Sequence, residues 1–332
     1  MERLTGLVAD LHSRSAGVER VTAITVLGEN VLVTSVHETI SRMFIAKRPR
    51  WRELNGAIEK HYADFPIKQP KFSENIERIA SLERDGIVFI DDVLDSNELA
   101  RVKAGLATEM QAIREGKQDS LGIDSDYISS TPECGRFRLY RVDLRVPETH
   151  VFRDHPMLID LVDAYMGGNL STLELALEMR RPPPDWDRAL GDLIPHTDHV
   201  FRELKIYLAL DDITDDNGPI IYWTGTHRTG EWRRLPDYLA SIGGIWAESS
   251  NILNQTTVAN LMKRSPEFAG CREVRCTIKA GSTFACDTRG LHQASYLNRG
   301  ERWHLYSAYG VNGYVRRRIP NEENWFQSLD LS

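Results

Sequence analysis

Apolar and polar residues alternate along much of the chain from residue 171 onward. The segments ELKIYLAL, STFACD and WHLYSAYG place apolar residues two apart and are rich in β-branched and aromatic side chains. This spacing is typical of strands that bury one face. Turns join the strands, with few helices between them. The pattern therefore predicts an antiparallel jelly-roll, and the fold class is α+β, mainly β with helices.

Helical spacing is more common in the part of the chain before these strands. A helix that ends near Gly86 precedes a short strand at 87–91, and Asp95, with an acid three residues on, is placed to cap the next helix. The segment 134–146 is strand-like. Residues 156–168 have helical spacing and end in two glycines. We expect these helices to cover the jelly-roll.

The first seventy residues are expected to form a separate layer that precedes the main domain. A hairpin is predicted at 21–36 and a helix at about 38–62, interrupted near a proline, and further prolines then break regular structure. We therefore divide the chain into an N-terminal extension, 1–72, packed on the core, and a main domain, 73–332. Residues 232–268 are a large insertion between core strands of that domain.

Composition limits the class of protein. The 41% hydrophobic and 27% charged residues are those of a soluble globular protein, and the net charge of −7 argues against a broad nucleic-acid surface. No run of about 18 apolar residues predicts a membrane span. The N-terminal segment does not resemble a signal peptide, so a cytoplasmic location is expected. None of the four cysteines forms a CxxC pair, which disfavours a zinc ribbon.

The sequence PHTDH at 195–199 suggests half of a metal site. Side chains two apart on a strand share a face, so His196 and Asp198 would point the same way and His199 the other way. The third ligand expected is His292, which a jelly-roll can bring close from a distant strand. Two histidines and one carboxylate leave three positions open, which is the ligand set of non-haem Fe(II) oxygenases.

An arginine completes this hypothesis. A 2-oxo acid such as 2-oxoglutarate would take two open positions and O₂ the third. Its far carboxylate needs a cation, and Arg302 lies ten residues after the predicted distal histidine. Arginine binds a carboxylate through two parallel hydrogen bonds, which lysine cannot do. His304 should share a strand face with Arg302. It either lines the cosubstrate site or only packs against other side chains in the interior.

Several stretches, taken in order, resemble the phytanoyl-CoA dioxygenase (PhyH) family of Fe(II)/2-oxoglutarate oxygenases. They are LERDGIVFIDDVLDSNELARV at 82–102, HTD at 196–198, LALDDITDDNGPI at 208–220, GTHR at 225–228 and LHQASYLNRGER at 291–302. The similarity covers roughly 80–315. Thr224 and Ser282 depart from residues common in the family, but neither stands at a metal position.

The resemblance implies a double-stranded β-helix with iron, 2-oxoglutarate and O₂ as cofactors. It implies that His196, Asp198 and His292 bind the metal, that Arg302 holds the 2-oxoglutarate tail, and that the aromatic ring of Tyr207 lies against the cosubstrate. The aspartate favours hydroxylation over halogenation, because halogenating relatives have a small residue there.

Other residues are candidates for the substrate pocket. Arg138 is one candidate for contact with an acidic substrate, although surface salt bridges explain most arginines near it equally well. Arg181 lies near a proline-rich segment that carries Trp186 and could form a lid, with a plain surface loop as the alternative. His199 is expected near the metal or on the pocket wall.

The sequence therefore predicts a dioxygenase that hydroxylates, or otherwise oxidises, an unactivated C–H bond of a small-molecule metabolite, with secondary metabolism as one source of substrate. Succinate and CO₂ would be released. Two alternatives stay open, a cupin-like metalloenzyme that uses no 2-oxo acid, and a jelly-roll that binds a ligand without catalysis. The extension 1–72 could shape the pocket, contact a second copy in a homodimer, or merely extend the domain.

Overall fold

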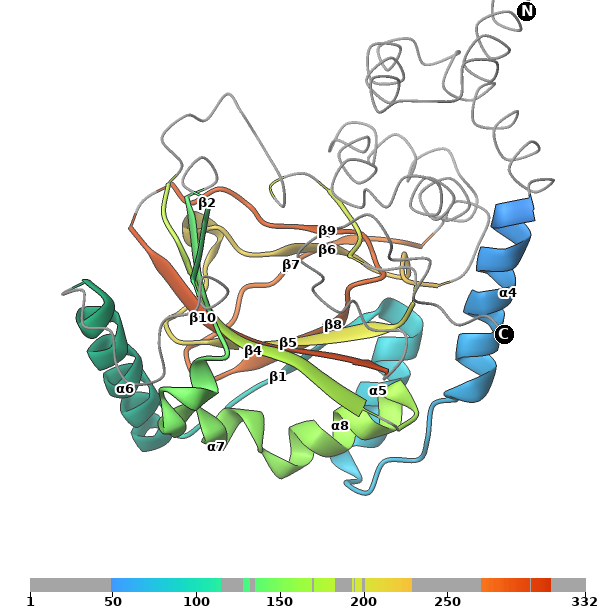
Figure 1. The fold of residues 1–332 in the computed structure, drawn as a ribbon, viewed down its shortest axis with the longest axis horizontal. Coiled ribbons are helices and arrows are strands. Elements are labelled where there is room, and N and C mark those ends of the chain that lie inside the picture. Colours follow the sequence, from blue (N-terminus) through green and yellow to red (C-terminus); the bar gives the residue numbers. More distant parts are fainter. Residues whose placement is uncertain are drawn as a thin grey trace, which may run out of the picture.

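The protein forms two antiparallel sheets with helices on one side (Figure 1). This arrangement is seen in a computed structural model. The structure describes residues 49–114, 128–131, 135–168, 170–182, 193, 195–198, 201–228, 270–298 and 300–311. The predicted hairpin at 21–36 and the insertion at 232–268 therefore lie outside the described residues.

The larger sheet has seven strands in the order β1-β8-β5-β10-β4-β3-β2. Every neighbouring pair in it is antiparallel. Its strands are β1 (Ile87–Ile90), β2 (Ile128–Thr131), β3 (Arg136–Tyr140), β4 (Leu170–Arg180), β5 (Glu203–Ala209), β8 (Thr283–Asp287) and β10 (Arg302–Val311). Strands distant in sequence alternate within this sheet, as the predicted jelly-roll requires.

The smaller sheet has the order β7-β6-β9, with β6 at Ile221–Trp223, β7 at Glu273–Arg275 and β9 at His292–Gln293. Its Tyr222 belongs to the same buried cluster as Tyr207, Phe284 and Tyr306 of the larger sheet. The two sheets therefore pack face to face. This arrangement confirms the predicted α+β fold with a jelly-roll core.

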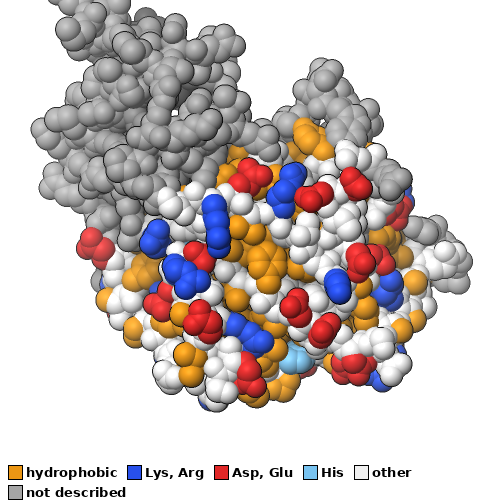
Figure 2. All heavy atoms as spheres, turned by 180° about the vertical axis from the view of Figure 1, so that it is seen from behind, with side chains coloured by type: hydrophobic (Ala, Val, Ile, Leu, Met, Phe, Trp, Pro, Cys, Tyr) orange, Lys and Arg blue, Asp and Glu red, His pale blue; other side chains and the backbone are white. Residues whose placement is uncertain are grey.

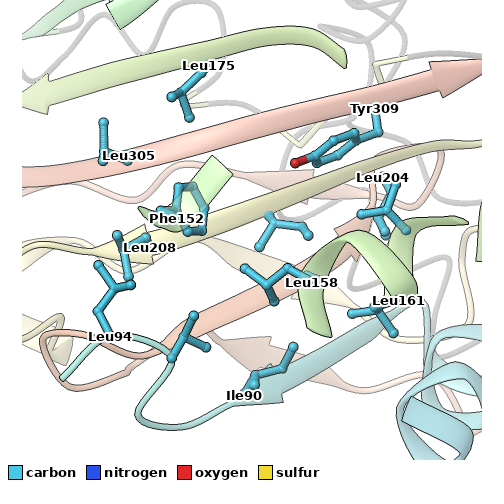
Figure 3. Packing of buried hydrophobic residues seen from close by; sticks show 14 of the residues in the cluster. Ile90, Leu94, Phe152, Leu158, Leu161, Leu175, Leu204, Leu208, Leu305 and Tyr309 are labelled. Carbon is cyan, nitrogen blue, oxygen red and sulfur yellow. The ribbon is translucent and has the colours of Figure 1, made fainter. Parts of the chain in front are cut away.

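Helices cover the outer face of the larger sheet (Figure 1). They are α5 (Glu74–Asp85), α6 (Ser96–Arg114), α7 (His150–Arg153) and α8 (Pro156–Met166). Leu158 and Leu161 of α8 are fully buried and pack with Leu204 and Leu305 of the sheet (Figure 3). Burial of one such leucine contributes roughly 1.5 to 3 kcal/mol, so this interface is a major source of stability.

Strand alternation divides each strand of the larger sheet between two environments. On β10, Leu305 and Tyr309 belong to the cluster that packs against the helices. Tyr306 belongs to the cluster between the sheets, and the same alternation turns Arg302 and His304 toward that interior. The helix side is thus apolar, while the space between the sheets holds buried charge.

Several local predictions are confirmed. Helix α5 ends at Gly86, which adopts the left-handed conformation with φ 78°. Asp95 accepts hydrogen bonds from the N–H groups at the start of α6, and Glu98 accepts one in return from the Asp95 N–H. The strand predicted over 134–146 was too long. It ends at Tyr140, because the left-handed backbone at Arg141 starts a short 3-10 helix.

Helix α4 (Pro49–Asp64) connects the N-terminal part of the chain to the barrel. Its Tyr62 lies between two guanidinium groups, with Arg202 4.6 Å and Arg289 5.5 Å from the centre of its ring. The Tyr62 hydroxyl also accepts a hydrogen bond from Arg289. Such cation–π contacts are stronger when buried, so α4 is anchored on the core. The division of the chain at residue 72 stays a prediction.

Positive and negative side chains are interspersed over the face of the described residues that Figure 2 shows. Apolar side chains lie between them. In the described part of the chain, no helix is long and apolar enough to cross a membrane.

Buried His61 generates a prediction about pH. Burial, followed by the charges of Arg202 and Arg289, lowers the pKa of this imidazole from 6.5 to about 3. The unfolded chain therefore takes up the proton first, and the free energy of unfolding falls as the pH drops below 6.5. At pH 5 this one group costs about 2 kcal/mol relative to pH 8.

We expect His61→Phe to reduce this loss, because phenylalanine keeps the ring contacts with Phe65 and Phe201 and does not titrate. Denaturant unfolding of both proteins at pH 8 and pH 5 measures the difference. An equal loss in both proteins would show that the buried imidazole is not responsible.

Candidate metal centre

Three side chains from distant parts of the sequence meet at one point. His196, Asp198 and His292 each offer one ligand atom, and these atoms all lie within 4.8 Å of one another. Nε2 of His196 is 3.7 Å from Oδ1 of Asp198, and Nε2 of His292 is 3.6 Å from Oδ2. Within the described part of the chain, no other group of this kind was found. These are the three residues that the sequence singled out.

A backbone bridge brings the two histidines together. The N–H of His196 donates to the carbonyl oxygen of His292 at 2.8 Å, and the N–H of His292 donates in return at 2.9 Å. Residues paired in this way place their side chains on the same side, and the two ring centroids lie 4.4 Å apart. The Asp198 N–H donates to the carbonyl of Thr288, which fixes the third side chain against the same segment.

The turn before His292 orients its ring. Nδ1 of His292 lies 2.9 Å from the carbonyl oxygen of Gly290. A carbonyl only accepts, so Nδ1 carries the proton and Nε2 is free to face Asp198. Glycine is required here, because a Cβ at position 290 would lie 1.9 Å from the hydroxyl of Tyr222. That hydroxyl donates to the carbonyl of Asp287 and holds the turn in place.

A lysine that the sequence analysis did not single out faces this centre. Nζ of Lys205 donates to Oδ2 of Asp198 at 2.6 Å. Burial raises the pKa of the Asp198 carboxyl, but the charge of Lys205 outweighs burial and holds this pKa well below its usual range. The carboxylate in turn raises the pKa of Lys205 well above its usual value, although burial lowers it. Lys205 precedes Tyr207 by two residues on β5, so the two side chains share a face of the strand. This spacing could have predicted that Lys205 faces the interior.

The donor set fits a ferrous ion. Two imidazole nitrogens and one carboxylate oxygen suit Fe(II), while the ligand set has none of the thiolates that soft metals prefer. The carboxylate is ionised and the histidine nitrogens converge on it. The three groups would occupy one side of a six-coordinate ion and leave the rest for other ligands.

The residues predicted for the cosubstrate lie between the sheets. Arg302 is buried, and His304 follows on the same face of β10. The ring of His304 is 5.4 Å from that of Tyr207 on the neighbouring strand. Burial lowers the pKa of His304 to about 3, so its imidazole is neutral at pH 7. The structure thus brings these three predicted residues to one interior wall.

A buried acid and two arginines extend this wall. Glu178 forms ion pairs with Arg138 and Arg180, and Nε2 of His304 lies 3.7 Å from its carboxylate. Burial raises the pKa of Glu178, but Arg138 and then Arg180 outweigh it and keep the acid ionised. Glu178 was not among the residues predicted from the sequence. The alternation of β4 indicated its inward direction, but its partners come from the long-range pairing of β4 with β3 and β10.

The substrate candidates have different positions. Arg138 points between the sheets, with its guanidinium 5.5 Å from the centre of the Tyr306 ring. Arg181 is half exposed and pairs with Glu301 at 2.5 Å. Trp186 and His199 lie outside the described residues.

Three solved structures with this fold are similar to the chain. EctD from S. alaskensis, with 2-oxoglutarate and 5-hydroxyectoine, gives a TM-score of 0.52 at 16% identity, covering 75% of this chain and 82% of that one. The non-heme alpha-ketoglutarate-dependent carbocyclase SnoK from nogalamycin biosynthesis gives 0.52 at 16%, covering 78% and 93%. The epimerase SnoN, in complex with Fe3+, alpha ketoglutarate and nogalamycin RO, gives 0.51 at 17%, covering 75% and 88%. At these identities the likeness establishes the fold.

A comparison with curated protein sequences gave no match. The sequence model of the phytanoyl-CoA dioxygenase (PhyH) family, however, matches residues 82–303, which is well over half of the chain. The match spans His196, Asp198, His292 and Arg302. The protein therefore belongs to the phytanoyl-CoA dioxygenase (PhyH) family and is an iron- and 2-oxoglutarate-dependent enzyme.

Proposed function

We propose that the protein is a dioxygenase that hydroxylates, or otherwise oxidises, an unactivated C–H bond of a small-molecule metabolite. In hydroxylation, one atom of O₂ enters the substrate as the hydroxyl oxygen, and the other enters succinate as 2-oxoglutarate loses CO₂. The observation that carries the proposal is the convergence of His196, Asp198 and His292, whose ligand atoms lie within 4.8 Å of one another.

In this proposal the three side chains hold iron from one side. When bound together with 2-oxoglutarate and O₂, the iron supplies the oxidising power that breaks the C–H bond. The chain itself provides geometry. The bridge between His196 and His292 keeps the two imidazoles at a constant separation, and the hydrogen bond to Gly290 keeps Nε2 of His292 directed at the metal.

Arg302 binds the far carboxylate of 2-oxoglutarate. Its burial supports this role, because a guanidinium away from water binds a carboxylate strongly and with a defined direction. His304 and Tyr207 line the same wall. A neutral imidazole offers hydrogen bonding without a further charge, and the Tyr207 ring provides an apolar surface for the carbon chain of the cosubstrate.

Arg138 and Arg181 are the described candidates for contact with the substrate. Arg138 lies beside the Tyr306 ring, between the sheets. Arg181 follows directly after β4 and lies nearer to solvent. Trp186, in a possible lid over the substrate, and His199, on the pocket wall, stay predictions.

The two alternative functions make different predictions for one experiment. Anaerobic addition of Fe(II) and 2-oxoglutarate should give a weak visible absorption band, because the 2-oxo acid chelates the iron. Admission of O₂ with a panel of metabolites should then release succinate together with an oxidised product. A cupin-like metalloenzyme without a 2-oxo acid, or a ligand-binding jelly-roll, would give neither the band nor the succinate.

Loss of a ligand should remove the metal. We expect His196→Ala and Asp198→Ala each to weaken Co(II) binding by more than about 100-fold, since loss of partners outside the ligand shell already costs up to about 100-fold. Titration calorimetry of the metal-free proteins measures this. The control is His150→Ala, because that histidine bonds the carbonyl of Asp143 in another part of the fold. Wild-type affinity in the Asp198 variant would refute the assigned ligand.

Loss of Arg302 should affect the cosubstrate and spare the metal. Truncation of one partner of a buried charged pair costs roughly 2 to 5 kcal/mol, so Arg302→Ala should weaken 2-oxoglutarate binding by at least about thirtyfold. Titration of the visible band with 2-oxoglutarate measures the change, and Co(II) affinity should be unaltered. Arg181→Ala is the matched control, because its exposed pair with Glu301 lies at the outer end of the same pair of strands. Normal 2-oxoglutarate binding by Arg302→Ala would exclude the proposed contact.

A further inference from the structure

Lys205 is a partly buried cation that contacts Asp198 of the proposed metal centre and has no part in the proposed reaction. Its side chain is 17% exposed, and it extends from β5 into the space between the sheets. Nζ lies 2.6 Å from Oδ2 of Asp198 and 3.6 Å from Oε1 of Glu203. The same Nζ is 5.8 Å from the centre of the Tyr306 ring. These contacts place a positive charge next to a proposed metal ligand, where it would repel a bound metal cation.

A metal ion and this ammonium group share one carboxylate. A divalent ion bound to Asp198 would lie about 2.0 to 2.2 Å from a carboxylate oxygen, and hence within a few ångströms of Nζ. Like charges at that separation repel strongly in a site from which water is largely excluded. In the metal-free protein, by contrast, the ammonium group compensates the charge of a partly buried carboxylate, which would otherwise destabilise the fold.

We propose that Lys205 is a built-in counter-cation of the metal centre, which holds Asp198 in place in the metal-free protein and weakens the affinity of the site for divalent ions. This inference rests on the proposed metal ligands. Lys205 is thus a positioning residue for Asp198. Its charge should lower the affinity of the site for a divalent metal ion.

Glu203 makes this role compatible with a bound metal. When the metal attracts the charge of Asp198, the carboxylate of Glu203 remains near the ammonium group as a second acceptor. Glu203 is itself held by the hydroxyl of Thr288, which donates to Oε1 at 3.1 Å. The carbonyl of Thr288 accepts from the Asp198 N–H, so both acceptors of Lys205 are fixed by one residue.

Three substitutions separate charge from hydrogen bonding. Lys205→Met removes both, Lys205→Gln keeps a donor without the charge, and Lys205→Arg keeps the charge. The control is Lys103→Met, because Lys103 pairs with Asp211 at the same 2.6 Å in a pair that is about half exposed. For each metal-free protein, titration calorimetry gives the Co(II) dissociation constant, and thermal unfolding gives Tm with and without Co(II).

We expect Lys205→Met and Lys205→Gln to bind Co(II) at least about tenfold more tightly than the wild type, because the repulsion is gone. Their metal-free Tm should fall, and the rise in Tm on adding Co(II) should be larger. Lys205→Arg should keep an affinity near that of the wild type, and Lys103→Met should change neither quantity. Lys205→Gln retains a donor to Asp198, so it gives a result if the methionine variant does not fold.

Unchanged or weaker Co(II) binding in Lys205→Gln would overturn the proposal, even if Tm falls, because a merely structural lysine lowers stability without tightening the metal. Failure of the proposed metal centre gives a different result. In that case the wild type itself does not bind Co(II), or Asp198→Ala binds it equally well.

Discussion

The pair of backbone hydrogen bonds between His196 and His292 is the constraint on which the site depends. These residues are almost a hundred positions apart, and neither belongs to a long strand of the larger sheet. Their mutual bonds of 2.8 and 2.9 Å make the two imidazoles neighbours before any ligand arrives. Side chains positioned in advance would bind a metal with a smaller loss of conformational entropy. The glycine turn at Gly290 and the Asp198–Thr288 bond extend the same constraint to the third side chain.

The larger sheet separates stability from chemistry. On β4, β5 and β10, every second side chain on one face is mainly leucine and packs against the helices. The burial of these apolar side chains stabilises the sheet. Residues of the other parity face the space between the sheets. Glu178 and Arg302 are buried there and Lys205 is partly buried, and ionised groups in such surroundings need opposite charges nearby. The cost of burying charge at the centre is therefore offset by packing on the far side of the same strands.

The part of the chain before the PhyH match contributes to this arrangement. Tyr62 of α4 lies between Arg202, which follows the His196–Asp198 segment, and Arg289, which precedes His292. Arg202 also donates to the carbonyls of Phe65 and Tyr165, so one guanidinium joins α4 and α8. The described residues of α4 thus contact arginines that lie next to both segments carrying the proposed metal ligands.

The sequence by itself determined the fold class, the helix ends at Gly86 and Asp95 and the identities of the three converging residues, because spacing, capping and residue type are local properties. Arg302, Tyr207 and His304 also followed from strand parity and family resemblance. Only the tertiary structure decided the partners of those residues. The bond from Lys205 to Asp198 and the arginines around Glu178 arise where strands distant in sequence pair, and strand register depends on packing of the whole sheet.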